Sequence, residues 1–379
     1  MKRRTFCKCL GCGAALAAAP TSRLLPEFLG GLQNAYAFST TRELAEVEAR
    51  FYEKLPEGGI ECRICPRRCR ITDLERGYCG TRENREDTYY TLVYGLPCSL
   101  NIDPIEKKPL FHFHPGTTAL SLATAGCNVN CKFCQNWEIS QVRPEETINI
   151  SLPPAEAVRL CRERQVPTIA YTYSEPVIFY EYMYDIAELG QKEDIKSVMI
   201  TGGYIEPEPL AVLLPQLDAV KVDLKAISEA YYRDIVDGEL KPVLDALVQI
   251  RKAGVWLEIV YLVVPTLNDS DAEFRDLAIW IRENLGSEVP LHFTRFHPQY
   301  LLKNLPPTPK ATLERAYEIA RSEGLDYVYL GNLPGHPAES TYCPKCGQVV
   351  IGRQGFTISA LNLSDGHCAN CNHPIPGIF

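Results

Sequence analysis

The chain has 379 residues, of which 46% are hydrophobic and 23% charged, so it can bury a large core in one big domain with small modules. A formal net charge of −8 argues against electrostatically driven binding to nucleic acid, which needs clustered Lys and Arg. Sixteen cysteines, many of them in tight CxxC-type groups, indicate metal or iron–sulfur ligation rather than a disulfide framework.

The first predicted element is an export signal. An Arg-Arg pair at residues 3–4 precedes a weakly apolar stretch, and residues 35–37 have the small-x-small form of a cleavage site. This pattern is typical of a twin-arginine signal peptide over residues 1–37, with a frayed basic terminus as the alternative. The segment is too short for a permanent membrane span. We expect export to the periplasm or another extracytoplasmic space if the signal functions, and a cytoplasmic protein otherwise.

Residues 38–117 are predicted to form a cysteine-rich module. A short helix is expected over Arg42–Lys54, where apolar residues recur near helical spacing. Four cysteines that follow can hold a structural zinc ion, which the tied, arginine-rich loop favours, or a second iron–sulfur cluster as an electron relay. They are Cys62, Cys65, Cys69 and Cys79. His112 and His114 can face one side of a strand as a metal pair, although a structural role is preferred.

Residues 118–335 alternate strand-like apolar runs with amphipathic segments. The runs lie at 119–125, 168–173, 197–202, 219–225, 255–264, 291–296 and 327–332. Helices fit at Pro154–Arg164, Pro176–Leu189, Pro207–Leu214, Leu240–Ala253, Asp271–Leu285 and Ala311–Ser322. This order predicts an α/β fold with a parallel sheet and right-handed crossovers. Six or seven units favour an open (β/α) barrel, with its site at the carboxyl ends of the strands.

The loop after the first of these strands contains three cysteines at CxxxCxxC spacing, Cys127, Cys131 and Cys134. Each thiolate can bind one iron of a 4Fe-4S cluster, which leaves the fourth iron without a protein ligand. An open coordination site is typical of catalytic centres, and this one can chelate S-adenosylmethionine (SAM). Phe133 can shield the cluster. The alternatives are a zinc knuckle that lacks one ligand and three structural thiols.

This loop, AGCNVNCKFCQNWEIS, resembles the cluster motif of the radical SAM superfamily. From about Glu61 onward, the chain resembles the activating enzymes of pyruvate formate-lyase. It resembles more closely the radical SAM proteins of the AmmeMemoRadiSam system. The further motifs that carry this resemblance are AYTYSEP, VKVDLKA, VPTLNDS and HFTRFHP. The resemblance implies reductive cleavage of SAM to a 5′-deoxyadenosyl radical that abstracts hydrogen from a substrate. It also implies a one-electron donor such as flavodoxin or ferredoxin, and Memo-like and AMMECR-like partners.

The resemblance implies SAM contacts at the ends of successive strands. Glu175 matches the glutamate that receives the SAM amino group, while a carboxylate at a helix N-terminus is its structural alternative. Thr201 and Gly202 lie where related enzymes often have Thr-Asn-Gly. The asparagine is missing here, but the glycine permits close approach of the backbone to SAM.

Three further SAM contacts are implied by the same resemblance. Asp223 and Lys225 match an Asp-x-Lys pair that contacts the methionine part of SAM, and a solvated ion pair is the alternative. His297 matches a histidine near the SAM nucleoside, although a lone histidine is often structural. No catalytic residue is assigned beyond the cluster ligands. Tyr173, Tyr204 and Tyr300 are candidates for a radical-bearing or proton-donating role, although a tyrosine in a barrel mouth more often lines the pocket.

Residues 336–379 are predicted to form a second metal module. A CPxCG motif is followed 21 residues later by CxxC, a pattern typical of a zinc ribbon whose four thiolates close the coordination sphere. The expected ligands of this structural zinc are Cys343, Cys346, Cys368 and Cys371. Spacing alone does not separate zinc from a rubredoxin-like iron.

Three functions are compatible with these patterns. The first is a radical SAM enzyme that acts on another protein. The second is a radical SAM enzyme for a small molecule, whose barrel mouth should be narrow and closed by the flanking modules. The third is a metal-binding scaffold, which ranks last because a scaffold does not need SAM-contact residues at successive strand ends.

Overall fold

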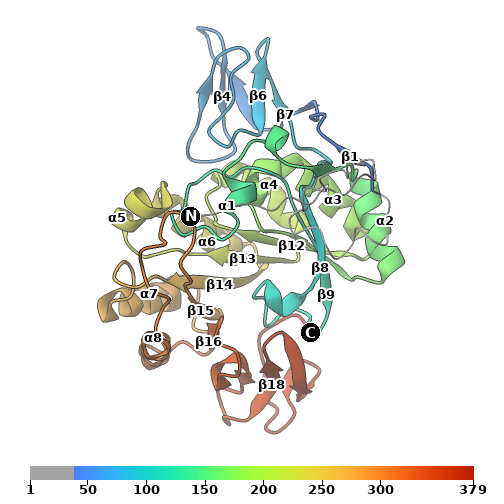
Figure 1. The fold of residues 1–379 in the computed structure, drawn as a ribbon. Helices are drawn as coiled ribbons and strands as arrows, with labels where there is room; N and C mark the ends of the chain where they lie inside the picture. Colours follow the sequence, from blue (N-terminus) through green and yellow to red (C-terminus); the bar gives the residue numbers. More distant parts are fainter. Residues whose placement is uncertain (1–37) are drawn as a thin grey trace, which may run out of the picture.

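The computed structural model describes residues 38–379. Figure 1 shows the N-terminal hairpins and the C-terminal small sheet at opposite ends of a central sheet. The predicted twin-arginine segment, 1–37, lies outside the described residues, as do Cys7, Cys9 and Cys12. Within the described range, no helix is both long and apolar enough to cross a membrane.

The central sheet has eight strands in the order β16-β15-β14-β13-β12-β11-β9-β8. Seven are parallel, and β8 (Ser99–Pro104) pairs antiparallel with β9 at one edge. Within the described residues β16 does not pair with β8, so the sheet stays open. The predicted α/β fold with an open (β/α) barrel is confirmed. The parallel strands are β9 (Thr118–Ala123), β11 (Thr168–Tyr171), β12 (Lys196–Thr201), β13 (Ala219–Asp223), β14 (Trp256–Val263), β15 (Leu291–Arg295) and β16 (Val328–Gly331).

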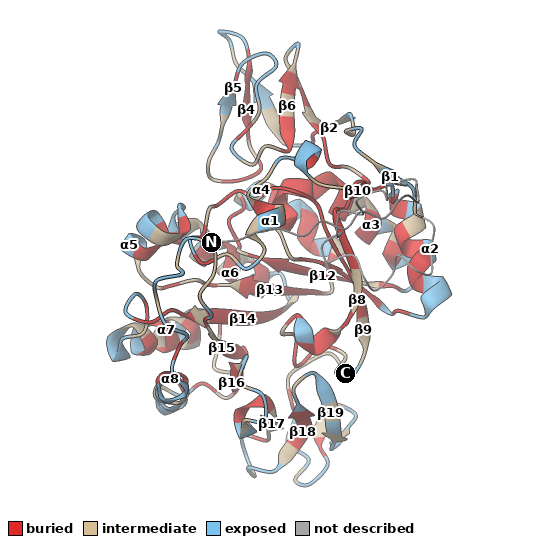
Figure 2. Cartoon of the chain, in the orientation of Figure 1, coloured by how far each residue is buried: buried red, intermediate tan, exposed pale blue. Residues whose placement is uncertain are grey.

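The long helices connect these strands and pack one apolar face on the sheet. Figure 2 shows buried and exposed faces on the same helices. Pro154 is the first residue of α2, a position where its missing N–H costs no hydrogen bond. Ser270 caps the start of α7, where its hydroxyl oxygen accepts a hydrogen bond from the Glu273 amide. These helices are α2 (Pro154–Arg164), α3 (Tyr180–Lys192), α4 (Pro207–Leu213), α6 (Leu240–Lys252), α7 (Asp271–Asn284) and α8 (Lys310–Ser322).

Short helical turns occupy several of the loops. The predicted helix at Pro176 begins as a 3₁₀ turn, η4, before α3 starts. A π-helical turn, η6, directly follows α5 and packs against the cysteine loop after β9. The turns are η2 (Ile105–Lys107), α1 (Trp137–Ser140), η3 (Pro144–Glu146), η4 (Pro176–Phe179), η5 (Leu214–Gln216), α5 (Glu229–Tyr231), η6 (Tyr232–Val236) and η7 (Pro337–Glu339).

The helix predicted over Arg42–Lys54 is wrong, because this segment forms short strands. The Ala45 and Ala49 amides donate to the carbonyls of Leu92 and Tyr89, so the backbone pairs with a distant strand. An isolated 13-residue helix is marginal in water, and tertiary pairing outweighs its weak periodicity. The N-terminal strands are β1 (Thr40–Thr41), β2 (Val47–Glu48), β3 (Tyr52–Lys54), β4 (Ile60–Cys62), β5 (Arg70–Ile71), β6 (Arg82–Arg85), β7 (Thr88–Thr91) and β10 (Asn149–Ile150).

The C-terminal module packs on the far end of the central sheet. Its core combines Val350 and Ile351 with Tyr329 of β16 and Phe111 of the segment before β9. His112 in that segment is buried, with Nδ1 2.6 Å from the carbonyl of Pro376. His112 therefore ties the module to the barrel, in agreement with a structural role. The strands are β17 (Thr341–Tyr342), β18 (Val349–Gln354), β19 (Thr357–Leu361), β20 (Leu363–Ser364) and β21 (His367–Cys368).

Candidate functional site

A cavity of about 590 Å³ opens where the parallel strands end. Many of the residues predicted to form the site line this one cavity. The lining includes Cys127, Cys131, Cys134, Phe133, Glu175, Gly202, Asp223 and Lys225. The volume is within the usual range for small-molecule sites. The fold therefore brings together residues that are about 100 positions apart in the sequence.

The cysteine loop is fixed by its backbone. The Asn130 and Lys132 amides donate to the carbonyls of Val236 and Ile235 in the π-helical turn, at 3.1 and 2.9 Å. Gly126, which begins the loop, has φ of 97° and lies against the N-terminal module. These contacts hold the loop in place at the end of β9.

Burial shapes the chemistry of the loop thiols. It raises the pKa of Cys131 to about 12 and that of Cys127 well above the usual value for a thiol. A buried thiol loses its proton when a metal cation compensates the negative charge. In the described residues, the three thiols are not among the groups whose ligand atoms all lie within 4.8 Å of one another.

Glu175 lies at the centre of a hydrogen-bond network at the ends of β11 and β12. Its carboxylate accepts bonds from the Thr201 hydroxyl at 2.5 Å and the Gly202 amide at 2.8 Å. It also accepts a hydrogen bond from the Val177 amide, and through this bond Glu175 caps η4. Burial raises the pKa of Glu175. The structure thus joins Glu175, Thr201 and Gly202, although Thr201 reaches the cavity only through Glu175.

Asp223 and Lys225 face the cavity from the end of β13. The Lys225 ammonium is 3.9 Å from one oxygen of Asp223 and 5.7 Å from the centre of the Phe133 ring. The other oxygen of Asp223 is paired with Lys221. Residues two apart on a strand point to the same face, so Lys221 and Asp223 share the inner face of the sheet. The Lys225 side chain is 15% exposed and the Asp223 side chain 34% exposed, so the pair is partly buried.

His297 is not brought to the cavity. It is exposed in the segment after β15 and is absent from the cavity lining. Tyr173 does line the cavity, where its hydroxyl donates to Asp103. Tyr300 stacks instead on Trp137, with ring centres 5.4 Å apart.

Among the polar cavity residues that the sequence analysis missed are Lys108, Lys221 and His292. Lys221 and Asp223 alternate along one strand, and this period of two was the available signal. Lys108 precedes β9 in an irregular segment, so no local pattern marks it. His292 lies in the apolar run of β15, where a single buried histidine gives little information.

The four cysteines of the N-terminal module are near one another but are not a compact tetrahedral group. Burial raises the pKa of the Cys65 thiol, and repulsion from the neighbouring thiolates raises it further. These neighbours are Cys62, Cys79 and Cys69. The Tyr78 amide donates to Cys69 Sγ at 3.4 Å, and the Thr81 hydroxyl donates to Cys79 Sγ at 3.3 Å. The quartet is not among the groups whose ligand atoms lie within 4.8 Å. A second cavity of about 740 Å³ is lined by both Cys79 and Cys127.

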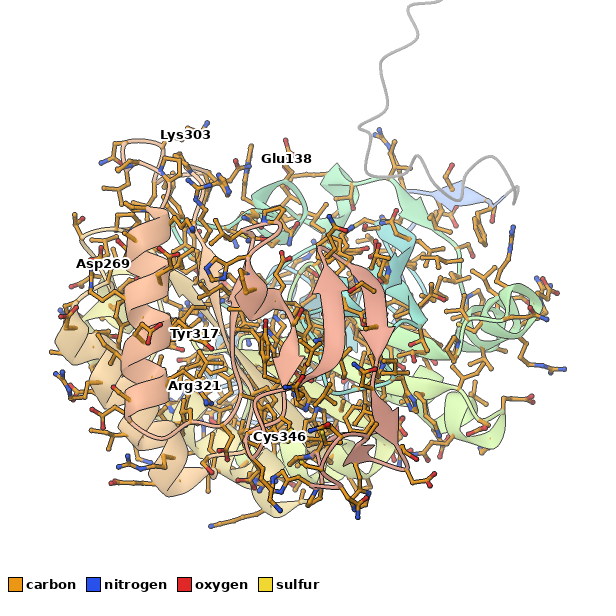
Figure 3. All side chains as sticks on the ribbon, turned by 90° about the horizontal axis from the view of Figure 1, so that it is seen from below. Glu138, Asp269, Lys303, Tyr317, Arg321 and Cys346 are labelled. Carbon is orange, nitrogen blue, oxygen red and sulfur yellow. The ribbon has the colours of Figure 1, made fainter. Side chains whose placement is uncertain are left out.

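The C-terminal cysteines do form a compact group. All four Sγ atoms lie within 4.8 Å of one another, and Figure 3 marks Cys346 in this module. The Sγ atoms of Cys343 and Cys371 are 3.6 Å apart, and those of Cys346 and Cys368 are 3.7 Å apart. Tetrahedral coordination with metal–sulfur bonds of about 2.3 Å places ligand sulfurs about 3.8 Å apart. The group therefore fits one tetrahedral metal ion.

Comparison with known proteins gives three findings. The profile of the Radical SAM superfamily matches residues 121–278. The chain is 46% identical over 330 residues to "Uncharacterized protein MJ0808" of Methanocaldococcus jannaschii, which covers 86% of this chain and 98% of the relative. It is 26% identical over 175 residues to the pyruvate formate-lyase-activating enzyme of Clostridium pasteurianum, with 45% and 72% covered. A solved radical SAM methyltransferase from Sphaerobacter thermophilus matches with a TM-score of 0.46 and 19% identity, over 62% of this chain and 71% of that chain.

Proposed function

This chain belongs to the radical SAM superfamily and is an enzyme, and on that premise we propose that Cys127, Cys131 and Cys134 hold a 4Fe-4S cluster that binds SAM. The observation that carries the proposal is the shared cavity, where the three thiols meet the polar groups at the ends of β11, β12 and β13. When bound, the reduced cluster supplies the electron that cleaves SAM to a 5′-deoxyadenosyl radical, which abstracts hydrogen from the substrate.

The residues around the cavity then bind and orient SAM. The Glu175 carboxylate is fixed by three donors and can accept a further bond from the SAM amino group. Asp223 and Lys225 offer opposite charges to the zwitterionic methionine part. A Cβ built on Gly202 would lie 3.3 Å from Oε2 of Glu175, so a larger residue here would push on this carboxylate. Phe133 covers the cluster loop and limits water.

The substrate is part of the proposal. Similarity to an activating enzyme supports a protein substrate. Memo-like and AMMECR-like partners of the AmmeMemoRadiSam system are part of the proposal through the sequence motifs alone. One observation supports a small-molecule substrate. Lys107, Lys108 and Phe111 before β9, together with Gly355 and Phe356 of the C-terminal module, line the same cavity. These two segments pack together at one end of the sheet and narrow the interior of the barrel, as a small substrate requires.

The accessory metals and the cell location are further parts of the proposal. We propose structural zinc at the compact C-terminal quartet. Zinc or a second iron–sulfur cluster is proposed for the looser N-terminal quartet. We also propose a barrel at 118–335 between modules at 38–117 and 336–379. Electron delivery by a flavodoxin or ferredoxin and twin-arginine export are two further proposals. Measuring zinc and iron per chain in the purified protein tests the two metal assignments.

The main test is anaerobic reconstitution. Electron paramagnetic resonance of the dithionite-reduced protein, with and without SAM, is combined with chromatography for 5′-deoxyadenosine. We expect a cluster signal that SAM perturbs, and 5′-deoxyadenosine as product, both lost in Cys131→Ala. Cys161→Ala is the matched control, because Cys161 is buried in α2 and does not line the cavity. Zinc alone, without a cluster signal or SAM cleavage, would contradict the proposal and favour the scaffold.

A further inference from the structure

The interior of the barrel contains two buried lysines beneath the proposed SAM site. Lys108 is 2% exposed and Lys221 is 4% exposed, and both line the cavity. Lys221 lies two residues before Asp223 on β13, so its Cα is about 7 Å deeper in the barrel. Lys108 enters from the segment before β9. Burial lowers the pKa of both groups, and the charge of Lys221 adds to this effect at Lys108.

Neither lysine has enough acceptors. An ammonium group has three N–H donors. In residues 38–379, the Lys108 ammonium donates only to Asp103, at 2.5 Å, with the Tyr173 ring centre 4.6 Å away. The Lys221 ammonium donates only to Asp223. Each ammonium thus keeps donors that no side chain or carbonyl of the described residues accepts, and these donors can bind a further acceptor.

The carboxylates of the two lysines are each shared with a second lysine. Asp103 also binds Lys107 at 2.8 Å, and Asp223 also faces Lys225. The other acidic groups that line the cavity are already bonded to backbone amides. These are Glu106 with Gly116, Glu175 with Gly202 and Glu339 with Gly335. His292 is bonded to the buried Glu258. Asp103 and Asp223 are therefore each shared between two ammonium groups, and no other carboxylate that lines the cavity is hydrogen-bonded to Lys108 or Lys221 in the described residues.

Part of the remaining wall is apolar. Ile200 of β12, Val260 and Leu262 of β14, and Leu330 of β16 line the cavity. A ligand held here would contact hydrocarbon along its body and two ammonium groups at one end. The cavity of about 590 Å³ would be shared with SAM, so the ligand has to be small.

We propose that this part of the cavity binds a small carboxylate with an apolar body, and that Lys108 and Lys221 hold its carboxylate. The two lysines are binding residues for the substrate of the proposed radical SAM reaction, and the inference rests on that function. The anion end lies deep in the barrel. The apolar body then points toward the cysteine loop, where SAM would be cleaved.

The test is isothermal titration of the reconstituted, SAM-loaded enzyme under anaerobic conditions. The probes are benzoate, hexanoate and succinate, each compared with its neutral amide, and inorganic phosphate. At least one carboxylate should bind at one site per chain and at least about tenfold more tightly than its amide, as expected for a hydrogen bond to a charged group. Lys108→Met and Lys221→Met should each weaken that binding by about tenfold or more.

Lys303→Met is the control, because Lys303 is exposed and lies at the edge of the molecule in Figure 3. Its carboxylate affinity should match that of the wild type. Absence of binding by all three carboxylates, equal binding of the amides, or phosphate binding alone would overturn the inference. The comparison of acid with amide uses the wild type, so it stands even if a lysine variant does not fold. Formation of 5′-deoxyadenosine in the same preparation shows separately whether the proposed function holds.

Discussion

Replacing Gly126 with alanine would place a Cβ atom 2.5 Å from Cγ2 of Thr81 and 2.6 Å from the carbonyl oxygen of Cys79. The Cys79 contact involves backbone and cannot be relieved by a rotamer change. Gly126 also has φ of 97°, a conformation that costs a non-glycine residue about 1–2 kcal/mol. Overpacking adds about 1–3 kcal/mol, while reduced freedom of the unfolded chain returns less than about 1 kcal/mol. The expected loss of stability is about 2–4 kcal/mol.

This loss should act on the site as well as on the fold, because Gly126 directly precedes Cys127. We expect Gly126→Ala to lower the anaerobic melting temperature by about 5 °C or more and to reduce the iron bound per chain. Melting is followed by circular dichroism, and iron by colorimetric assay. Gly254→Ala is the matched control, since Gly254 has φ of 75° but no atom within 4 Å of the added Cβ. If the two variants melt together and bind equal iron, the close packing of the N-terminal module on the loop is refuted.

Three other predictions follow from buried charges. Glu175→Gln should weaken SAM binding at least about tenfold, measured by equilibrium dialysis, while the cluster signal without SAM is retained. The Arg82 guanidinium lies 2.6 Å from the Glu181 carboxylate, and both side chains are almost fully buried. Arg82→Met alone should lower the unfolding free energy, measured by urea titration, by about 3–5 kcal/mol, because it leaves the carboxylate buried without its partner. Adding Glu181→Gln should restore part of this loss. Burial lowers the pKa of Lys108 to about 8 in the folded protein, below the usual value for a lysine. Above about pH 8 the unfolded chain therefore binds more protons than the folded one, and stability rises with pH. As pH rises from about 8 to 9.5, the wild type should gain unfolding free energy relative to Lys108→Met. A flat difference across this range would contradict the assigned burial of its charge.

Sequence patterns predicted the barrel well where structure is locally encoded. The helix expected at Pro154–Arg164 has those bounds, and the seven apolar runs match the seven parallel strands. Each of these elements repeats its apolar residues with its own period, so its type follows from neighbours in the chain. The helix predicted over Arg42–Lys54 failed because Val47 and Glu48 pair with β7, more than 40 residues later, and the end of the segment pairs with β4.

The sequence by itself determined the order of strands and helices and placed three thiols in one short loop. Spacing along one short loop sets how many thiolates can meet, and this information is local. Tertiary structure alone decided that Lys108 enters the same cavity as Lys221 and that His297 stays outside it. It also decided that, among the cysteines of residues 38–379, the C-terminal four form the compact group that fits one tetrahedral ion. These facts depend on how distant segments pack side by side, and no periodicity in the chain records such distances.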